Sequence, residues 1–178
     1  MKKILITVIF ILSLLSSCTV ISELTKFDLP LEHSVNIPKA IVVSGIPVDI
    51  YSTEIETNSD DFLKQNNIKA DLIDKITLRK MELIVSTSSD GNFNFADSIQ
   101  ISILTDSLPE IRIASVDKIT ANAGGTIKFI VDPIDLKQYI LKKKIKLKIT
   151  MAVNATVPED YTVMIKPTFL IDLKVLGL

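Results

Sequence analysis

The sequence predicts a mainly β protein: an antiparallel β-sandwich of about eight strands with one or two short helical insertions. Apolar and polar residues alternate over much of the chain, which is the period of a strand with one buried face. The apolar stretches are rich in isoleucine and valine, and glycine is scarce, with 5 in 178 residues. No alternation of strand and helix patterns occurs, so antiparallel pairing is expected.

The strands are predicted from apolar residues spaced two apart. The clearest case runs from Ile145 to Val153, where the apolar residues are opposed by lysines and Thr150. The other alternating sets are Leu29 to Ile37, Ile46 to Ile50, Met81 to Val85, Ile99 to Ile103, Ile111 and Ile113, Ile127 and Phe129, and Tyr161 to Val175. Pro167 falls on the apolar phase of the last set. Because proline has no N–H to donate, that strand is expected at an edge, or to bend or bulge there.

Two helical insertions are expected, each covering an open end of the sandwich. In the first, Asn58 or Ser59 caps a turn with Asp60 and Asp61 near its N-terminus and Phe62 and Leu63 facing inward, and a second turn runs from Lys69 to Lys75. In the second, Asp132 is the N-cap and Pro133 the first helical residue of a helix over Ile134 to Leu141. Turns are expected at Ser88 to Asn92 and at Ala123 to Gly125.

The first residues have the layout of a secretory signal peptide. Lys2 and Lys3 precede an apolar run from Ile4 to Leu15 that only Thr7 and Ser13 interrupt. The run is shorter than the roughly 20 apolar residues of a transmembrane helix. It ends in Leu15-Ser16-Ser17-Cys18, and Cys18 is the only cysteine of the chain, so no disulfide is expected.

Leu15-Ser16-Ser17-Cys18 resembles the lipobox of bacterial lipoproteins. The resemblance covers the export signal alone and implies cleavage before Cys18, a diacylglycerol thioether on its sulfur and a further acyl chain on the new amine. Two or more acyl chains give stable anchoring. The expected organisation is a signal peptide (1–17), a lipidated cysteine with a short tether (18–26) and a single β-sandwich domain (27–178). A conventional signal peptide with a chance cysteine is the alternative.

Charge and composition limit the classes of partner. Loss of residues 1–17 removes Lys2 and Lys3 from 20 basic residues against 21 acidic ones, which leaves 18 and a net charge of −3. Such a domain has no general electrostatic attraction for nucleic acid. The absence of tryptophan weakens a carbohydrate-binding interpretation without excluding it.

No catalytic, cofactor or metal site is predicted. His33 is the only histidine, and its phase among Leu31 and Val35 indicates a partly buried structural residue. Ala123-Gly124-Gly125 lacks the phosphate-loop pattern and is interpreted as a tight turn. The candidate acidic ligands are scattered, without the spacing of a calcium loop, and caps or turns explain them equally well: Asp60, Asp61, Asp90, Asp97 and Asp106.

Two surface features have alternative interpretations. Lys142, Lys144, Lys146 and Lys148 project to one side of a strand, either to rest on anionic lipid heads or, as we favour, to form an edge or solvent face that discourages aggregation. Asp97-Ser98-Ile99 and Asp106-Ser107-Leu108 resemble the Asp-Ser/Thr-aliphatic acceptor for O-glycosylation of exported proteins in some gut and oral bacteria. The resemblance implies glycans on Ser98 and Ser107.

The expected function is that of a non-enzymatic, membrane-anchored lipoprotein of the cell envelope, with a domain that binds or scaffolds an unidentified envelope protein or ligand. No acidic residue follows Cys18 directly, so an outer-membrane anchor facing the periplasm is expected, with surface exposure as the other possibility. The alternatives are an apolar-ligand carrier, a surface adhesin or pilus-type subunit that polymerises by strand exchange, and a hydrolase that uses His33.

Overall fold

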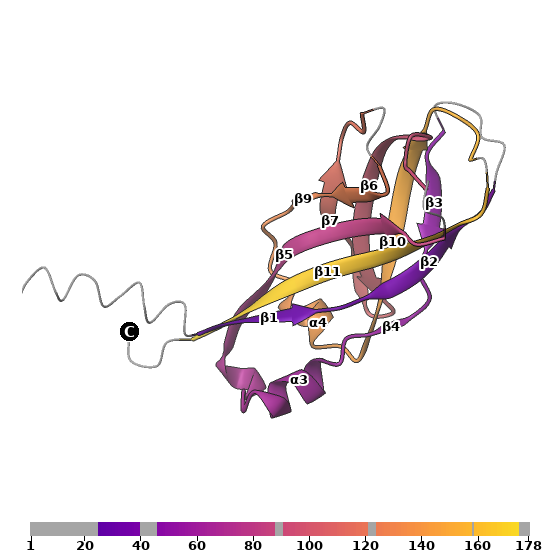
Figure 1. Cartoon of the computed structure of the whole chain (residues 1–178). Coiled ribbons are helices and arrows are strands. Elements are labelled where there is room, and N and C mark those ends of the chain that lie inside the picture. The colour runs from indigo at the N-terminus through magenta and orange to yellow at the C-terminus, as the bar shows by residue number, and fades with distance from the viewer. Residues whose placement is uncertain (1–24, 40–45, 88–90, 121–123, 158, 175–178) are drawn as a thin grey trace, which may run out of the picture.

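The computed structural model describes residues 25–39, 46–87, 91–120, 124–157 and 159–174, and within them it confirms the mainly β sandwich (Figure 1). The strands form one sheet of five and one of six, and every pairing is antiparallel. The count exceeds the expected eight because the segments predicted at Leu29 to Ile37 and at Ile127 and Phe129 are each divided in two, and a short strand at Ile55–Glu56 was not predicted.

Sheet 1 has the order β1-β11-β5-β8, with β2 also paired to β11. Its strands are β1 (Lys26–Pro30), β2 (His33–Ile37), β5 (Ile73–Val85), β8 (Thr126–Lys128) and β11 (Tyr161–Leu173). Sheet 2 has the order β3-β10-β6-β7-β9, with β4 also paired to β10. Its strands are β3 (Val48–Tyr51), β4 (Ile55–Glu56), β6 (Ala96–Thr105), β7 (Leu108–Val116), β9 (Ile130–Val131) and β10 (Lys144–Val153).

The interior faces of the two sheets share one hydrophobic core. β10 buries every second residue from Ile145 to Val153, as its alternation predicts. From sheet 1, Leu83, Ile165 and Phe169 are completely buried against it. Ile46 departs from the prediction, because it precedes β3 and is 61% exposed.

One side of the sandwich is closed by a strand that changes sheets. β8 pairs with β5 in sheet 1, and β9, two residues further on, pairs with β7 in sheet 2. Phe129 lies at the change, and its N–H donates to the carbonyl of Met81 (3.1 Å). On the opposite side, His33 Nε2 lies 2.8 Å from Thr53 Oγ1, which joins the edge of sheet 1 to the edge of sheet 2.

Pro167 explains why one edge segment appears as two strands. The register of β1 and β2 along β11 continues without a shift, which places Leu31 opposite Pro167. Leu31 N–H donates to the Pro167 carbonyl (2.9 Å), but proline cannot return the bond, so the ladder is interrupted. The prediction of an edge strand is wrong, since β11 has neighbours on both sides. The alternative of an irregularity is confirmed by a register shift at Thr168/Phe169.

The pairing of β5 with β11 shifts register twice, and at each shift the extra residue lies on β5. The register passes from Leu78 to Lys80 and from Ile73 to Lys75 against consecutive residues of β11, so Arg79 and Asp74 are bulged. The predicted second helical turn over Lys69 to Lys75 is therefore correct only at the 3₁₀ turn η1 (Ala70–Leu72). β5 begins immediately afterwards, at Ile73.

Helix α3 (Ser59–Gln65) follows the first prediction in position but not in capping. Asn58 is the N-cap, yet it adopts a left-handed conformation (φ 50°) and its side chain makes no capping bond. Leu63 is buried and Phe62 partly buried, as predicted.

The second helix is shorter than predicted. Asp132 does not cap it, because its carboxylate pairs with Arg112 (2.9 Å). The helix α4 (Lys137–Ile140) starts after Asp135, whose Oδ1 accepts the N–H groups of Lys137 and of Ile76 on β5 (both 3.0 Å). α4 contacts strands of both sheets, β5, β6 and β10, so it closes an end of the sandwich as expected.

Candidate functional site

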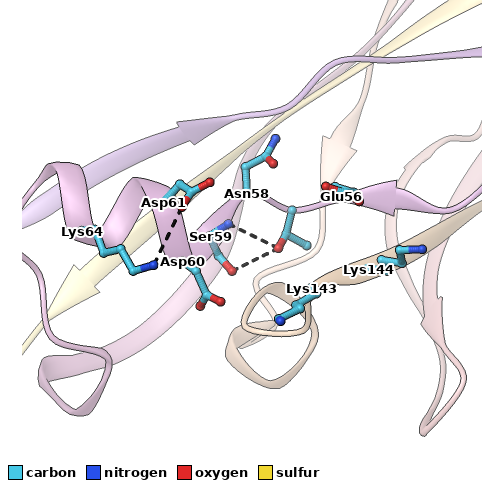
Figure 2. Close-up of a pocket in the computed structure, with 9 residues that line it drawn as sticks. Glu56, Asn58, Ser59, Asp60, Asp61, Lys64, Lys143 and Lys144 are labelled. Atoms are coloured by element: carbon cyan, nitrogen blue, oxygen red, sulfur yellow. Dashed lines mark hydrogen bonds and ion pairs between the residues drawn. The ribbon is translucent and has the colours of Figure 1, made fainter.

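A polar depression of about 340 Å³ lies where β4, the start of α3 and the connection from α4 to β10 meet (Figure 2). β4 and α3 follow each other in the sequence, whereas the α4–β10 connection is about 85 residues away. The lining residues are Glu56, Thr57, Asn58, Ser59, Asp60, Asp61, Lys64, Lys143 and Lys144. We take this depression as the candidate site because it gathers three carboxylates, three lysines and two hydroxyl side chains around one hollow.

Thr57 links the segments that form the depression through hydrogen bonds. Its side chain is completely buried, and its hydroxyl donates to the carbonyl of Lys142 (2.7 Å) while lying 3.0 Å from Ser59 Oγ. Its N–H donates to the carbonyl of Lys143 (3.1 Å). Because every buried polar group needs a partner, these bonds fix the start of α3 against the α4–β10 connection.

Ser59 lines the depression and carries a hydroxyl of the kind that serves as a nucleophile in enzymes, but its surroundings are those of a structural serine. Its side chain is buried, and its hydroxyl shares a hydrogen bond with Thr57. His33, the only histidine, instead contacts Thr53. A serine needs an adjacent base to become a nucleophile, and the hydrogen-bond geometry pairs Ser59 Oγ with the Thr57 hydroxyl. The geometry of the depression offers hydrogen bonds and charged groups to a ligand.

The rim of the depression is electrically balanced. Three carboxylates (Glu56, Asp60, Asp61) face three lysines (Lys64, Lys143, Lys144). Lys64 lies 4.0 Å from Asp61, with both side chains well exposed. Lys144 donates to Glu54 (2.7 Å), and this hydrogen bond together with the charge of Glu54 raises the pKa of Lys144. Such a rim does not select anions or cations by net charge.

The structure separates the acidic residues that the sequence singled out. Asp60 and Asp61 are on α3, Asp97 accepts a hydrogen bond from Asn154 (2.6 Å), and Asp106 pairs with Lys146 (3.4 Å). Asp90 lies outside the described residues. Across the described ranges, no group of three or more histidine, cysteine, aspartate or glutamate side chains could hold a metal ion.

The lysine stripe is a solvent face with paired charges. Lys144, Lys146 and Lys148 project from the outer face of sheet 2, on a strand flanked on both sides, so the edge interpretation is wrong and the solvent-face interpretation holds. Lys148 lies 2.5 Å from Glu110 and 3.8 Å from Asp49. Its hydrogen bond to Glu110 is the main cause of its raised pKa. Paired in this way, the stripe has little charge left to attract lipid heads.

The two glycan acceptor motifs have different surroundings. Ser107 is exposed in the turn between β6 and β7, where its N–H contacts Thr105 Oγ1 (3.3 Å). Ser98 is half-buried within β6, opposite Ala152. Enzymatic modification needs access to the hydroxyl, so the Ser107 motif is the better placed. Cys18 lies outside the described residues.

An apolar dent is the remaining hollow of interest. It lies between β2 and β3, where the edges of the two sheets face each other, and is lined by Ile37, Pro38, Val48, Ile50, Met151, Val153 and Val157. Its volume is about 40 Å³. A single water occupies about 30 Å³ in the liquid, so the dent is far smaller than a lipid chain. Among the described helices, none has the length and hydrophobicity to cross a bilayer.

Sequence reasoning did not find the candidate depression. Asp60 and Asp61 were proposed as helix residues and Lys144 as part of a stripe, but Thr57 and Lys143 were not considered. The usable signal is Thr57-Asn58-Ser59, in which a threonine two residues before a serine at a helix start provides local hydrogen bonds. The contact to Lys142 has no such signal, because it joins residues 85 apart in the chain.

Comparison with known proteins gives no family. No family model matches the chain, and no curated protein matches it. Two solved structures have low similarity. One is a decameric BFDV capsid protein (TM-score 0.39, 13% identity, 84% of this chain and 98% of that chain), and the other is FLHE (TM-score 0.32, 7% identity, the same coverage). Similarities this low carry no argument about function.

Proposed function

We propose that this protein is a lipid-anchored lipoprotein of the cell envelope whose β-sandwich binds or scaffolds an envelope partner without catalysing a reaction. The observation that carries the proposal is Leu15-Ser16-Ser17-Cys18, placed directly after a basic start and an apolar run. The described fold begins at Thr25, a few residues later. This short spacing supports an anchor that holds the domain close to a membrane.

The surfaces support contact with a partner more than chemistry. The candidate depression is polar and balanced in charge, with its buried hydroxyls engaged in hydrogen bonds. His33, on which a hydrolase would depend, is hydrogen-bonded to Thr53. The expected charge of −3 gives no reason to propose nucleic acid as the partner. The depression at Thr57 and Lys143 is our candidate contact surface.

The anchor is tested by labelling cells with radioactive palmitate. We expect the wild type to take up label and enter the detergent phase, and Cys18→Ser to stay unlabelled and keep its signal peptide. Ser16→Ala is the matched control, because a small residue at this position should leave processing intact. Equal labelling of Cys18→Ser and the wild type would contradict lipidation at Cys18.

The proposed location is the outer membrane, facing the periplasm. Protease treatment of intact cells tests the side: we expect the domain to stay protected until the outer membrane is opened. Digestion of the domain in intact cells would instead indicate that it lies on the cell surface.

Crosslinking in native cells, followed by identification of the crosslinked molecules, tests the binding role and separates a scaffold from an adhesin.

Neither non-enzymatic alternative is favoured by a particular observation. A carrier needs a cavity for a lipid chain, whereas the apolar dent among the described residues measures about 40 Å³. A pilus-type subunit needs an unfilled strand position. β9 pairs only with Ala114 and Ser115 of β7. In the rest of that side of β7, Pro109 has no N–H to offer and its carbonyl already accepts the Tyr139 hydroxyl (2.6 Å), which discourages strand addition there. Lipid extraction from purified protein lacking the acyl chains tests the carrier directly.

A further inference from the structure

The two ends of the described chain leave the sandwich at the same place. Lys26 at the start of β1 pairs with Asp172 near the end of β11, and Leu173 N–H donates to the Thr25 carbonyl (3.0 Å). Lys174 N–H donates to the Leu72 carbonyl (2.8 Å), which adds η1 to the same end. We name this surface, formed by η1, the start of β5 and the end of β11, the anchor end. It lies at the left of Figure 1.

The tether that follows Cys18 is long enough to meet the anchor end but too short to span sheet 1. Thr25 follows Cys18 by seven residues, which reach at most about 25 Å when extended. From Lys26 to Ile37, β1 and β2 run along β11 in one register. At the rise of a strand this segment spans about 36 Å. The far end of sheet 1 therefore lies beyond the reach of a tether that starts at Thr25.

The chemistry of the anchor end suits contact with lipid headgroups without insertion. It has four lysines and three aspartates in its turn and strand ends: Lys26, Lys69, Lys75, Lys174, Asp71, Asp74 and Asp172. The large apolar residues that are exposed in the described chain, Ile46, Tyr51 and Ile130, all lie elsewhere. Without a large, well-exposed apolar side chain among its described residues, the surface has little driving force to enter the hydrocarbon, and a surplus of one lysine gives only a weak preference for anionic lipid.

We infer that the anchor end is the surface that meets the bilayer, at headgroup depth, and that the β2 end of sheet 1 faces away from it. The inference rests on the proposed lipid anchor. Charge does not determine this orientation, because the outer faces of both sheets also carry paired ions, such as Lys166 with Glu32 (2.8 Å) and Lys148 with Glu110. The short tether and the position of β1 determine the orientation.

The test uses the full-length acylated protein in phosphatidylcholine vesicles. Cys18 carries the lipid, so an introduced cysteine is the single free thiol for a fluorophore. Lys69→Cys and Asp74→Cys place the label at the anchor end, and Lys39→Cys and Glu159→Cys place it at the far end. All four positions are exposed, so the fold should tolerate each change. Two positions at each end protect the result against one variant that fails to fold.

We expect a nitroxide on the lipid headgroup to remove most of the fluorescence at the two anchor-end positions and little at the two far-end positions. A nitroxide deep in the acyl chain should quench all four weakly, and added salt should change nothing, because surface charge is not the cause. Equal quenching at both ends of vesicle-bound protein would overturn the orientation while leaving the anchor intact. Failure of the acylated protein to float with vesicles would overturn the anchor, and the orientation with it.

Discussion

β10 and β5 are both long strands that deliver apolar side chains to the core, yet they are built differently. β10 buries every second residue and pairs with β6 in an even register up to Ala152. β5 contains two bulges, so its buried residues are spaced three or two apart along the strand. Regular backbone pairing suffices for β10, whereas β5 needs contacts from outside the sheet.

Those outside contacts come from the segment Asp135 to Lys137. In the part of β5 that β8 does not cover, the Ile76 N–H donates to the Asp135 carboxylate. The Ile76 carbonyl accepts the N–H of Leu136 (2.6 Å). Lys137 Nζ donates to the carbonyl of Ile73. The segment therefore takes the place of a neighbouring strand along an edge that the short β8 leaves uncovered. The comparison teaches that a strand edge left uncovered by a short neighbour must be satisfied by other groups, here the Asp135 carboxylate, the Leu136 N–H and the Lys137 ammonium.

The largest expected effect is common to both strands. Leu147→Ala in β10 and Leu83→Ala in β5 each remove a completely buried side chain and should lower the free energy of unfolding by about 2–5 kcal/mol. Urea denaturation measures the loss. A cost below about 1 kcal/mol for either variant would mean that its sheet does not belong to the common core.

The next effect should be specific to β5. Asp135→Ala leaves the N–H groups of Ile76 and Lys137 without their acceptor, and we expect a loss of about 1–3 kcal/mol in unfolding free energy. Asp74→Ala is the matched control, because this bulge residue is exposed, and its change should cost less than about 0.5 kcal/mol. Amide exchange at Ile76 should accelerate in the first variant alone. Unchanged exchange would remove the proposed role of Asp135.

A smaller effect tests the edge of sheet 2. Tyr139→Phe removes the hydroxyl that donates to the Pro109 carbonyl, and the unfolding free energy should fall by about 1 kcal/mol. Tyr51→Phe provides the comparison, because Tyr51 is 55% exposed and its hydroxyl remains accessible to water. Thermal unfolding of the two variants side by side measures the difference. Equal midpoints would show that the Tyr139 bond contributes nothing.

The smallest effect should appear at alkaline pH. The hydrogen bond to Glu110 raises the pKa of Lys148 above 10.5, and burial raises the pKa of Tyr139 above 10.0. A folded-state pKa above the unfolded value gives stability that is complete below the unfolded pKa and is lost as pH rises through the folded pKa. Stability should therefore decline above about pH 10. Urea midpoints should show a shallower decline for Lys148→Met, and an identical decline would contradict the Lys148 contribution.

How far the fold was predictable depended on local regularity. β10 was predicted residue by residue because alternation is a property of neighbouring residues in the chain. The first half of β5 was missed because its bulges separate Ile73 from Ile76 and Leu78 from Met81 by three residues, a spacing also found in helices. Asp132 was placed as a helix cap, but Arg112 on β7 binds it instead.

The candidate site was less predictable than the fold. Its segments meet through the pairing of β4 with β10 and through the bonds of Thr57 to Lys142 and Lys143, and no local sequence pattern predicts contacts between residues so far apart. The stripe of lysines was visible, but its pairing was not, because Glu110 and Asp49 lie on other strands. The sequence identifies the side chains that bear charge. The acidic residues on neighbouring strands determine how much of that charge is paired and how much can attract a ligand.

The sequence by itself determined the sandwich class and the Leu15-Ser16-Ser17-Cys18 motif on which the anchor is proposed, because alternation and export signals are local in the chain. Only the tertiary structure decided that Pro167 lies in a central strand, that Asp135 covers the edge of β5, and that both chain ends leave at the anchor end. These features depend on which distant backbone groups come within hydrogen-bond distance. Such contacts arise from the packing of whole sheets, which no short window of sequence contains.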